Sequence, residues 1–276
     1  MIKKTLEELS LHDDFMFGAV MVDPENCRCF LERVLEIEIE RVEVSIERSF
    51  IFSPESKSIR MDVYAKDEHQ THYDIEMQVA RKPALEKRSR YYHSQMDMEM
   101  LAKGTHYKAL SRAYVIFVCN FDPFYQKKYR YTIHKRCEET DEAFDDGAST
   151  IFLSTEGENR DEVPKELVTL LEFIKADLPD CEADSEDDYI KRLQTSMRQV
   201  KANRKMGERY MTIQEYVEEN YGEELRAEGR KEGYDEAMEK MYKLNLLLSK
   251  VNRQDELVRA MHDPEFRKKL FEEFGI

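Results

Sequence analysis

Two short segments of the chain alternate between apolar and polar positions in the way that β-strands do. They are Ile59–Ala65 and Tyr73–Val79, and each contains an acidic residue near its middle, Asp62 in the first and Glu76 in the second. Only a short polar turn, Lys66–His72, separates them, so the pattern predicts a β-hairpin. Residues directly opposite each other on paired strands share a face, and we therefore expect Asp62 and Glu76 to lie side by side.

The segments around this hairpin predict a mixed α/β core. Apolar residues spaced three and four apart favour a helix over 25–35, after one or two short helical turns within 5–20. Alternation favours a strand over 41–52, and the almost entirely apolar run 113–121 is typical of a central strand buried on both faces. The remaining segments are a helix over 85–110 and strands over 129–137 and 150–153.

After residue 163 the pattern becomes helical, with breaks at two prolines and at an acidic stretch. Helices are expected over 186–200 and 210–221, followed by a charged stretch over 225–233. We therefore predict three regions. In chain order they are an α/β core over 1–157, an acidic and helical extension over 158–224, and a charged linker with a small helical tail over 225–276.

The charge of the chain is unevenly distributed. Its 276 residues include 43 Lys and Arg and 58 Asp and Glu, which gives a net charge of −15 at pH 7. Residues 138–188 hold 3 basic and 19 acidic residues, which we expect to form a solvated surface; shielding of the active cleft and mimicry of DNA are the alternatives. Residues 79–112, directly after Glu76, hold 8 basic and 3 acidic residues. This local positive field favours an anionic substrate in spite of the net charge.

Several other classes of protein are disfavoured by the sequence. No apolar run approaches the roughly 20 residues needed to cross a bilayer, and the N-terminal residues lack the apolar core of a signal peptide. The five cysteines form no Cys-x-x-Cys pair, and neither zinc-ligand spacing nor a glycine-rich phosphate-binding motif occurs. We therefore expect a cytoplasmic protein with reduced thiols and no membrane partner.

The paired carboxylates of Asp62 and Glu76 indicate a metal site. Two carboxylates held side by side repel each other unless a positive charge lies between them. Ligation by oxygen alone suits Mg²⁺ or Mn²⁺. The alternative is that both acids are exposed strand residues that face water.

Asp62, then Glu76-x-Gln78 on the next strand, then a basic helix form an ordered set that resembles the PD-(D/E)xK nuclease superfamily. The closer likeness is to its Rpn branch, the recombination-promoting nucleases, which are also described as transposases. The segments that carry this likeness are Asp14–Val20, Asp62–Ala65, Asp74–Gln78, Lys87–Ser94 and Val118–Phe124. The likeness covers most of the chain and implies a restriction-endonuclease-like fold, with an αβββαβ core, a mixed sheet and a helical C-terminal region. It also implies a metal-dependent DNA endonuclease that hydrolyses phosphodiester bonds and is linked to recombination or mobile DNA.

The resemblance also implies roles for individual residues. Asp62 and Glu76 would ligate Mg²⁺, or Mn²⁺, with help from the backbone carbonyl of Met77. Gln78 stands where the superfamily has Lys, and it can position a water molecule but adds no positive charge, so the metal would supply most of the activation. Asp14 would reach the site from the N-terminal helix as an outer ligand; the alternative is that it caps that helix.

The basic segment after Glu76 supplies the candidate contacts to nucleic acid. Helical spacing brings Lys87, Arg90 and Tyr91 to one surface, and the alternative is a solvated helix face. The residues expected to contact DNA are Arg81, Lys82, Lys87, Arg88, Arg90 and Tyr91. Asp74, two positions before Glu76, is either a peripheral ligand or a charge at the edge of the sheet, and we favour the edge charge.

Two functions from different classes follow from these observations. The leading one is a Mg²⁺-dependent endodeoxyribonuclease. The alternative is a non-catalytic nucleic-acid-binding or interaction protein on the same fold, which Gln78 leaves open. An RNA nuclease is a third option, because a basic helix does not distinguish DNA phosphates from RNA phosphates. Restriction-endonuclease-like folds often work as dimers, so a homodimer is compatible with the resemblance. Cut-and-paste transposition is the least supported, since no separate DNA-binding domain is evident.

Overall fold

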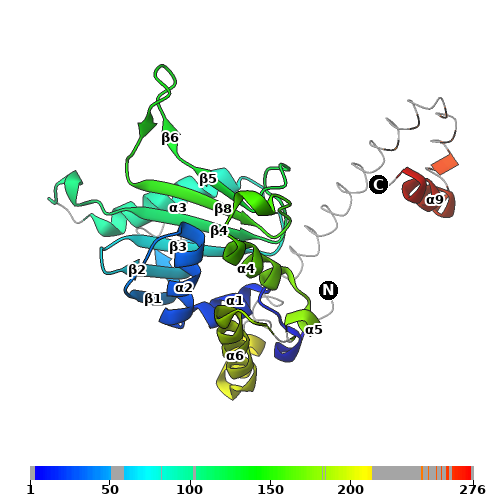
Figure 1. Cartoon of the computed structure of the whole chain (residues 1–276), viewed down its shortest axis with the longest axis horizontal. Helices are drawn as coiled ribbons and strands as arrows, with labels where there is room; N and C mark the ends of the chain where they lie inside the picture. The colour runs from blue at the N-terminus through cyan, green and yellow to red at the C-terminus, as the bar shows by residue number, and fades with distance from the viewer. Residues whose placement is uncertain are drawn as a thin grey trace. The chain divides into compact units, whose positions relative to one another are not determined.

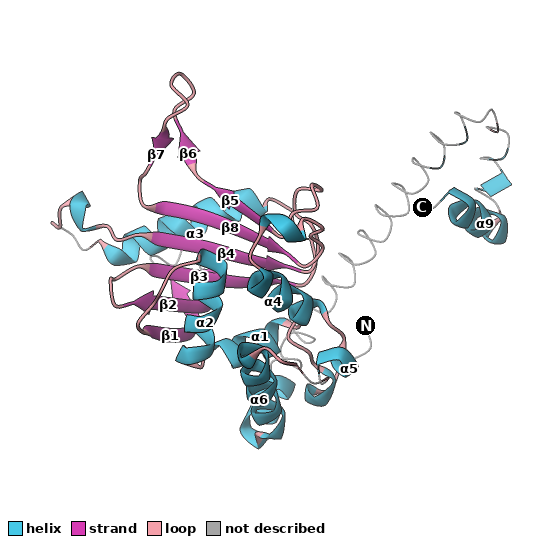
Figure 2. Cartoon of the chain, viewed as in Figure 1, coloured by secondary structure: helices cyan, strands magenta, loops and turns pink. Residues whose placement is uncertain are grey.

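The computed structural model describes residues 4–50, 59–81, 83–101, 104–181, 183, 185–212 and parts of the segment 244–274. A six-stranded mixed sheet forms the centre of the first part, with its strands in the order β1-β2-β3-β4-β8-β5 (Figures 1 and 2). The strands are β1 (Val42–Phe50), β2 (Ile59–Asp67), β3 (His72–Gln78), β4 (Ala113–Cys119), β5 (Arg130–Ile133) and β8 (Ala148–Ser154). The predicted α/β class is therefore confirmed.

The pairing of the strands explains their composition. Strands β1, β2 and β3 form an antiparallel meander, β3, β4 and β8 run parallel, and β5 returns antiparallel to β8. The β2–β3 hairpin is the one that the alternating pattern predicts. Strand β4 lies between β3 and β8 and is buried along nearly its whole length, as expected for an almost entirely apolar run.

Helices cover both faces of the sheet. Helix α3 lies on one face, and α1, α2 and α4 lie on the other (Figure 1). The α3 face has an aromatic core in which Tyr92 of α3 stacks on Phe117 of β4, and Phe117 stacks on Phe152 of β8. The helices are α1 (Asp14–Met21), α2 (Pro24–Leu35), α3 (Leu85–Met100), α4 (Lys165–Lys175), α5 (Leu178–Cys181) and α6 (Asp188–Ala202), with short 3₁₀ turns η1 (Leu6–Glu8), η2 (Tyr107–Ala109) and η3 (Arg160–Glu162).

The predicted helix over 85–110 is wrong in its length. Helix α3 ends at Met100, Leu101 has an extended backbone, and Gly104 has a φ of +88°. A positive φ cannot continue a right-handed helix and favours glycine. The basic stretch that follows β3 is therefore divided between α3 and a separate segment that contains η2.

The helices after the sheet are attached to the α/β core. Helix α6 packs against α1 and α2. Asn26 of α2 is fully buried, where its Nδ2 donates to Ser196 Oγ at 2.9 Å and its Oδ1 accepts from Arg192 Nε at 2.9 Å. The chain divides into two compact units, and the first runs to Glu208. The part of the predicted extension over 158–208 thus belongs to the same unit as the sheet.

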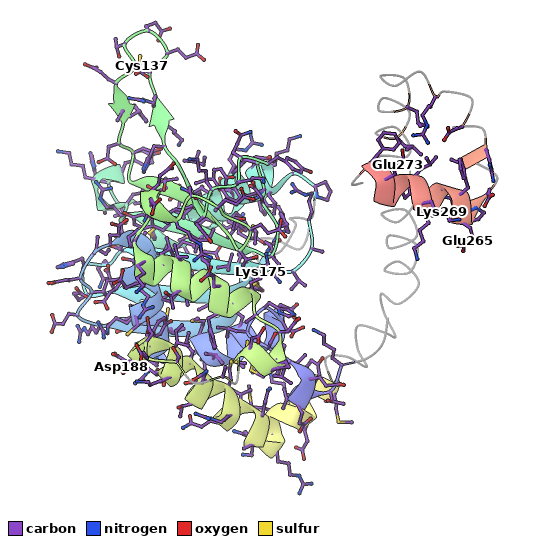
Figure 3. All side chains as sticks on the ribbon, turned by 45° about the vertical axis from the view of Figure 1, so that its right-hand side comes forward. Cys137, Lys175, Asp188, Glu265, Lys269 and Glu273 are labelled. Atoms are coloured by element: carbon purple, nitrogen blue, oxygen red, sulfur yellow. The ribbon has the colours of Figure 1, made fainter. Side chains whose placement is uncertain are left out.

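A two-stranded ribbon projects from the sheet between β5 and β8. Its strands are β6 (Lys135–Arg136) and β7 (Ala143–Phe144), and Cys137 lies near its tip (Figure 3). The segment predicted as one strand over 129–137 is therefore split between the sheet and this ribbon.

The second compact unit, Arg209–Ile276, has its own small apolar core. Helix α9 (Pro264–Phe274) contributes Leu270, which is buried together with Leu244, Leu248 and Ala260. This agrees with the helical tail expected from the sequence. The predicted helix over 210–221 beyond residue 212, and the charged stretch over 225–233, lie outside the described residues.

Candidate metal centre and nucleic-acid surface

The two predicted metal ligands lie where β2 and β3 separate. The pairs between these strands end at Val63 and Ile75, one position before Asp62 and Glu76. Strand β2 nevertheless stays paired with β1 as far as Ile59. The hairpin therefore forks at the two acids, and side-chain oxygens take over the backbone N–H groups that the ladder no longer uses.

Hydrogen bonds across the fork confirm that Asp62 and Glu76 lie side by side. The backbone N–H of Asp62 donates to Glu76 Oε1 at 3.1 Å, and the backbone N–H of Met77 donates to Asp62 Oδ2 at 3.2 Å. Glu76 is buried and Asp62 is half-buried. Each carboxylate thus accepts a hydrogen bond from the strand that carries the other acid. These bonds orient Glu76 Oε1 and Asp62 Oδ2.

Arg88 of α3 contacts both candidate site residues of β3, Glu76 and Gln78. Its Nη2 lies 3.2 Å from Glu76 Oε2, and its Nη1 donates to Gln78 Oε1 at 2.8 Å. Its Nη2 also donates to the hydroxyl of Tyr92, one helical turn further on, at 2.8 Å, and that hydroxyl lies 3.4 Å from Glu76 Oε2. The sequence predicts that Arg88 contacts DNA. In the structure its guanidinium lies against Glu76 and Gln78.

The amide of Gln78 is fixed at both ends. While Oε1 accepts from Arg88, Nε2 donates to the backbone carbonyl of Met77 at 3.0 Å. A carbonyl oxygen has two lone pairs, so this bond leaves one acceptor position on Met77 for a further partner. The arrangement is compatible with the predicted role of that carbonyl as a ligand.

Burial and nearby negative charge raise the pKa of Glu76 and of Asp74, two positions before it on β3. Burial, together with the charge of Asp62, raises the pKa of Glu76 to about 8, although the N–H of Asp62 and the guanidinium of Arg88 act in the opposite direction. Burial and the charge of Glu76 raise the pKa of Asp74 well above its ordinary value. A site that disfavours negative charge this strongly favours an added cation.

Asp74 is not an edge charge, so that interpretation of the sequence is wrong. Strand β3 lies between β2 and β4, and Asp74 is 0 % exposed. Among the described residues no donor reaches either of its carboxylate oxygens. A buried carboxyl that no donor reaches is unfavourable in its ionised form, so Asp74 is held neutral beside Glu76.

Asp14 lies at the start of α1 with an exposed side chain. Its Oδ1 accepts from the backbone N–H of Phe15 at 2.7 Å. The cap position of the helix belongs to Asp13, so the N-cap alternative for Asp14 is wrong by one residue. Its role as an outer metal ligand remains a prediction.

The remaining basic candidates differ in their surroundings. Lys87 and Arg90 are exposed on α3, and Tyr91 is half-buried against the aromatic core. Arg81 instead holds the loop after β4: its guanidinium donates to the carbonyls of Asp122 and Pro123 and lies over two aromatic rings. Lys82 lies outside the described residues.

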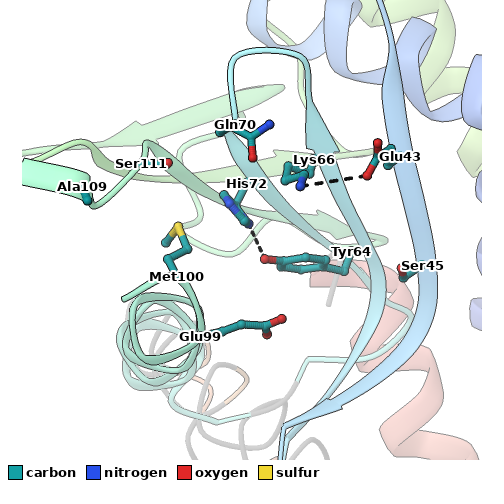
Figure 4. A pocket seen from close by; sticks show the side chains of 10 residues that line it. All are labelled: Glu43, Ser45, Tyr64, Lys66, Gln70, His72, Glu99, Met100, Ala109 and Ser111. Carbon is teal, nitrogen blue, oxygen red and sulfur yellow. Dashed lines mark hydrogen bonds and ion pairs between the residues drawn. The ribbon is translucent and has the colours of Figure 1, made fainter. Parts of the chain in front are cut away.

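A cavity of about 450 Å³ opens further along β2 and β3 (Figure 4). Tyr64 and His72 line it and share a hydrogen bond, and Lys66 pairs with Glu43 at 3.9 Å. None of the proposed metal ligands lines this cavity, which begins at Tyr64, two positions from Asp62 on the same strand. The cavity is thus a neighbour of the fork and not the fork itself.

The donor set at the fork fits a hard divalent cation. Asp62 and Glu76 offer carboxylate oxygens, and burial together with the charge of Asp62 raises the pKa of Glu76, so an added cation is favoured there. In the part of the chain that the structure describes, no three His, Cys, Asp or Glu side chains are grouped so that they could hold a metal ion together. A pair of carboxylates is a common protein contribution to a Mg²⁺ site, because this ion keeps waters and substrate oxygens as its other ligands.

The sequence gives no sign that Tyr92 belongs to this site, where it both packs on Phe117 and places its hydroxyl against Arg88 and Glu76. The spacing of Arg88 and Tyr92, one helical turn apart, does not say which face of α3 meets the sheet.

Comparison with known proteins gives one finding. A family model described as PD-(D/E)XK nuclease family transposase matches residues 12–224, which include every predicted site residue. No curated protein and no solved structure shows a significant match. Members of such a family are nuclease-like or act on mobile DNA, which implies a DNA substrate, and its nucleases generally use divalent metals. Of the helices that the structure describes, none has the length and hydrophobicity to span a membrane.

Proposed function

Because this chain belongs to the PD-(D/E)XK nuclease family transposases, we propose that it is a Mg²⁺-dependent endodeoxyribonuclease acting on recombining or mobile DNA. The observation that supports this most directly is the fork of β2 and β3, where Asp62 and Glu76 are each held by a backbone N–H of the opposite strand. Mn²⁺ has similar ligand preferences and is expected to replace Mg²⁺.

The residues at the fork have different roles in the proposed reaction. Asp62 and Glu76 hold the metal, and the Met77 carbonyl and Asp14 are further candidate ligands. When bound, the ion would acidify a water molecule and stabilise negative charge on the scissile phosphate. Gln78, whose amide is already oriented by Arg88 and Met77, positions that water.

Exposed cations on α3 provide the contacts that hold the DNA backbone. Lys87 and Arg90 face solvent on the helix that covers the fork. A cation that neutralises one phosphate contributes about one unit to the slope of log affinity against log salt. Removing either side chain should therefore flatten that plot by about this amount, without a preference for sequence. A slope equal to wild type in both variants would show that they are solvated surface charges.

Cleavage of supercoiled plasmid tests the proposal. The wild-type chain should nick or linearise the plasmid with Mg²⁺ and should do neither with EDTA. Asp62→Asn should slow this reaction by about a hundredfold or more, because the isosteric amide cannot hold the metal. Asp145→Asn is the matched control, since Asp145 is an exposed acid paired with Arg112, away from the fork.

The same assay separates the competing functions. A wild-type chain that shifts DNA in a gel but cleaves nothing with Mg²⁺ or Mn²⁺ would be the non-catalytic binding protein, which the neutral Gln78 makes the strongest alternative. A chain that cleaves RNA and leaves the plasmid intact would be a ribonuclease on the same fold.

A further inference from the structure

The proposed nuclease has no Lys on β3, and we propose that Arg88 supplies the missing catalytic cation from helix α3. In the structure the guanidinium of Arg88 lies 3.2 Å from Glu76 Oε2, one of the two carboxylate oxygens that could hold a divalent ion. An ion at that oxygen would displace Arg88, which would keep its hydrogen bond to Gln78 and donate to the scissile phosphate. This inference rests on the metal-dependent reaction proposed above.

The contacts of Arg88 place it where such a cation has to be. It bridges Glu76 Oε2, at 3.2 Å, and Gln78 Oε1, at 2.8 Å, which are the side chains two positions apart at the end of β3. A Lys at position 78 would bring its charge to the same place. Here the charge arrives from the facing helix, on a side chain long enough to cross from α3 to the sheet.

Arg88 is more exposed to solvent than the carboxylate with which it pairs. The side chain of Arg88 is 28 % exposed, whereas that of Glu76 is 2 % exposed. The ion pair therefore presents its cationic partner to solvent and keeps its anionic partner inside. A cation that takes Glu76 Oε2 has to displace the guanidinium, and a phosphate that approaches Arg88 meets a positive group.

The guanidinium also has donors left for a phosphate. An arginine carries five N–H groups, and Arg88 uses one on Nη1 for Gln78 and two on Nη2 for Glu76 and Tyr92. Its Nε–H and second Nη1–H donate to no group in the described part of the chain. Tyr92 anchors the guanidinium from the helix side, so release of Glu76 would not set the side chain free.

A purely structural arginine and a displaceable catalytic cation predict opposite effects on metal binding. If Arg88 only supported the site, its removal would loosen Glu76 and weaken binding. If it competes with the metal, its removal should tighten binding, because like charges no longer repel at the same carboxylate.

Calorimetric titration of the full chain with MnCl₂ and MgCl₂ measures this sign. Arg88→Met keeps the aliphatic stem without the charge, and it should bind the metal about tenfold more tightly than wild type. At saturating metal it should nevertheless cleave plasmid about a hundredfold more slowly, and Arg88→Lys should recover part of that activity. Arg112→Met, which removes an exposed cation paired with Asp145, should match wild type in metal affinity.

The outcomes separate this inference from the function on which it rests. A wild-type chain that binds neither metal removes the proposed function and the inference with it. A wild-type chain that binds metal, with Arg88→Met binding equally or more weakly, overturns the inference alone.

A measurement on the wild-type chain covers the case in which Arg88→Met does not fold. The ¹H–¹⁵N resonance of Arg88 Nε, assigned with Arg88→Lys, should shift when the metal saturates the site. A resonance that stays in place would show that the guanidinium does not leave Glu76, and would overturn the inference.

Discussion

Replacing Asp74 by Asn should stabilise the fold, although it changes a fully buried residue. Asp74 is 0 % exposed, none of the described donors reaches it, and it lies beside the carboxylate of Glu76. Because the pKa of Asp74 is raised well above its ordinary value, folding at neutral pH has to neutralise this carboxyl, which costs stability. An Asn at this position carries no charge in either state and keeps a donor for Glu76, so the substitution removes that cost.

The expected gain follows from the cost of burying a polar group without partners. That cost is about 1–3 kcal/mol for one group, so Asp74→Asn should raise the free energy of unfolding by about that amount. Most substitutions at buried sites destabilise a protein, so the sign of the change carries more information than its size.

Asp67, on the same hairpin, provides the matched control. It is 6 % exposed, but its Oδ1 accepts from the backbone of His69 and Thr71 at 2.9 and 2.8 Å, and its Oδ2 accepts from the Tyr73 hydroxyl at 2.7 Å. The same Asp→Asn exchange there replaces an acceptor by a donor that faces other donors. It should lower the free energy of unfolding by about 1–3 kcal/mol.

Urea unfolding followed by far-ultraviolet circular dichroism, with EDTA present, measures both variants against wild type. Opposite signs for Asp74→Asn and Asp67→Asn support the interpretation that Asp74 is unsatisfied and Asp67 is satisfied. A decrease in stability for Asp74→Asn similar to that for Asp67→Asn would refute it, because Asp74 would then have a favourable partner.

Three further predictions concern the rest of the first unit. Burial lowers the pKa of His93 from 6.5 to about 4, so the fold should lose up to about 3 kcal/mol of stability as the pH falls from about 6.5 toward 4. His93→Gln should remove this part of the pH dependence of urea unfolding. The same pH dependence in the variant and in wild type would contradict the prediction. Asn26→Ala removes a fully buried amide that donates to the carbonyl of Val20 in α1 and bonds Ser196 and Arg192 of α6, and it should lower the free energy of unfolding by about 1–3 kcal/mol in the same assay. A change within error would mean that water replaces the side chain. Arg81→Ala removes the contacts to the loop after β4 and should speed proteolysis between residues 121 and 127, whereas an unchanged rate would show that the loop is held without it.

The hairpin that carries the site could be predicted from the sequence because its information is local. Alternation places Asp62 and Glu76 on one face whatever the rest of the fold does, and the turn between the segments is too short for any other connection. The structure confirms the hairpin and pairs Val63 with Ile75, which brings the two acids together. The family likeness carried by these residues agrees with the family match over residues 12–224.

The error over Asp74 shows where local information ends. An acid in an alternating strand looks the same in sequence at the edge of a sheet and at its centre. Strand β4, which follows α3 in the chain, pairs with β3 in parallel, and this pairing buries Asp74. Strand order depends on contacts between distant segments, and the pattern within one strand does not contain it.

Arg88 shows the same limit for the chemistry of the site. In the sequence Arg88 is one basic residue in a run that includes Lys87 and Arg90. A count of local charge does not distinguish these three residues. Helix α3 docks on the sheet through Leu85, Tyr92 and Met96, which turns Arg88 inward and leaves Lys87 and Arg90 in solvent. One side chain thereby becomes part of the acidic site while its neighbours remain available to a substrate.

The sequence by itself determined the α/β class, the hairpin and the two acids that lie at its fork, because strand alternation and turn length act over a few residues. Only the tertiary structure decided that Asp74 is buried without a hydrogen-bond donor and that Arg88 lies against Glu76 and Gln78. Both outcomes depend on which strand becomes the neighbour of β3 and on which face of α3 packs against the sheet. Those choices minimise the exposed apolar surface of the whole core, and no single segment of the chain fixes them.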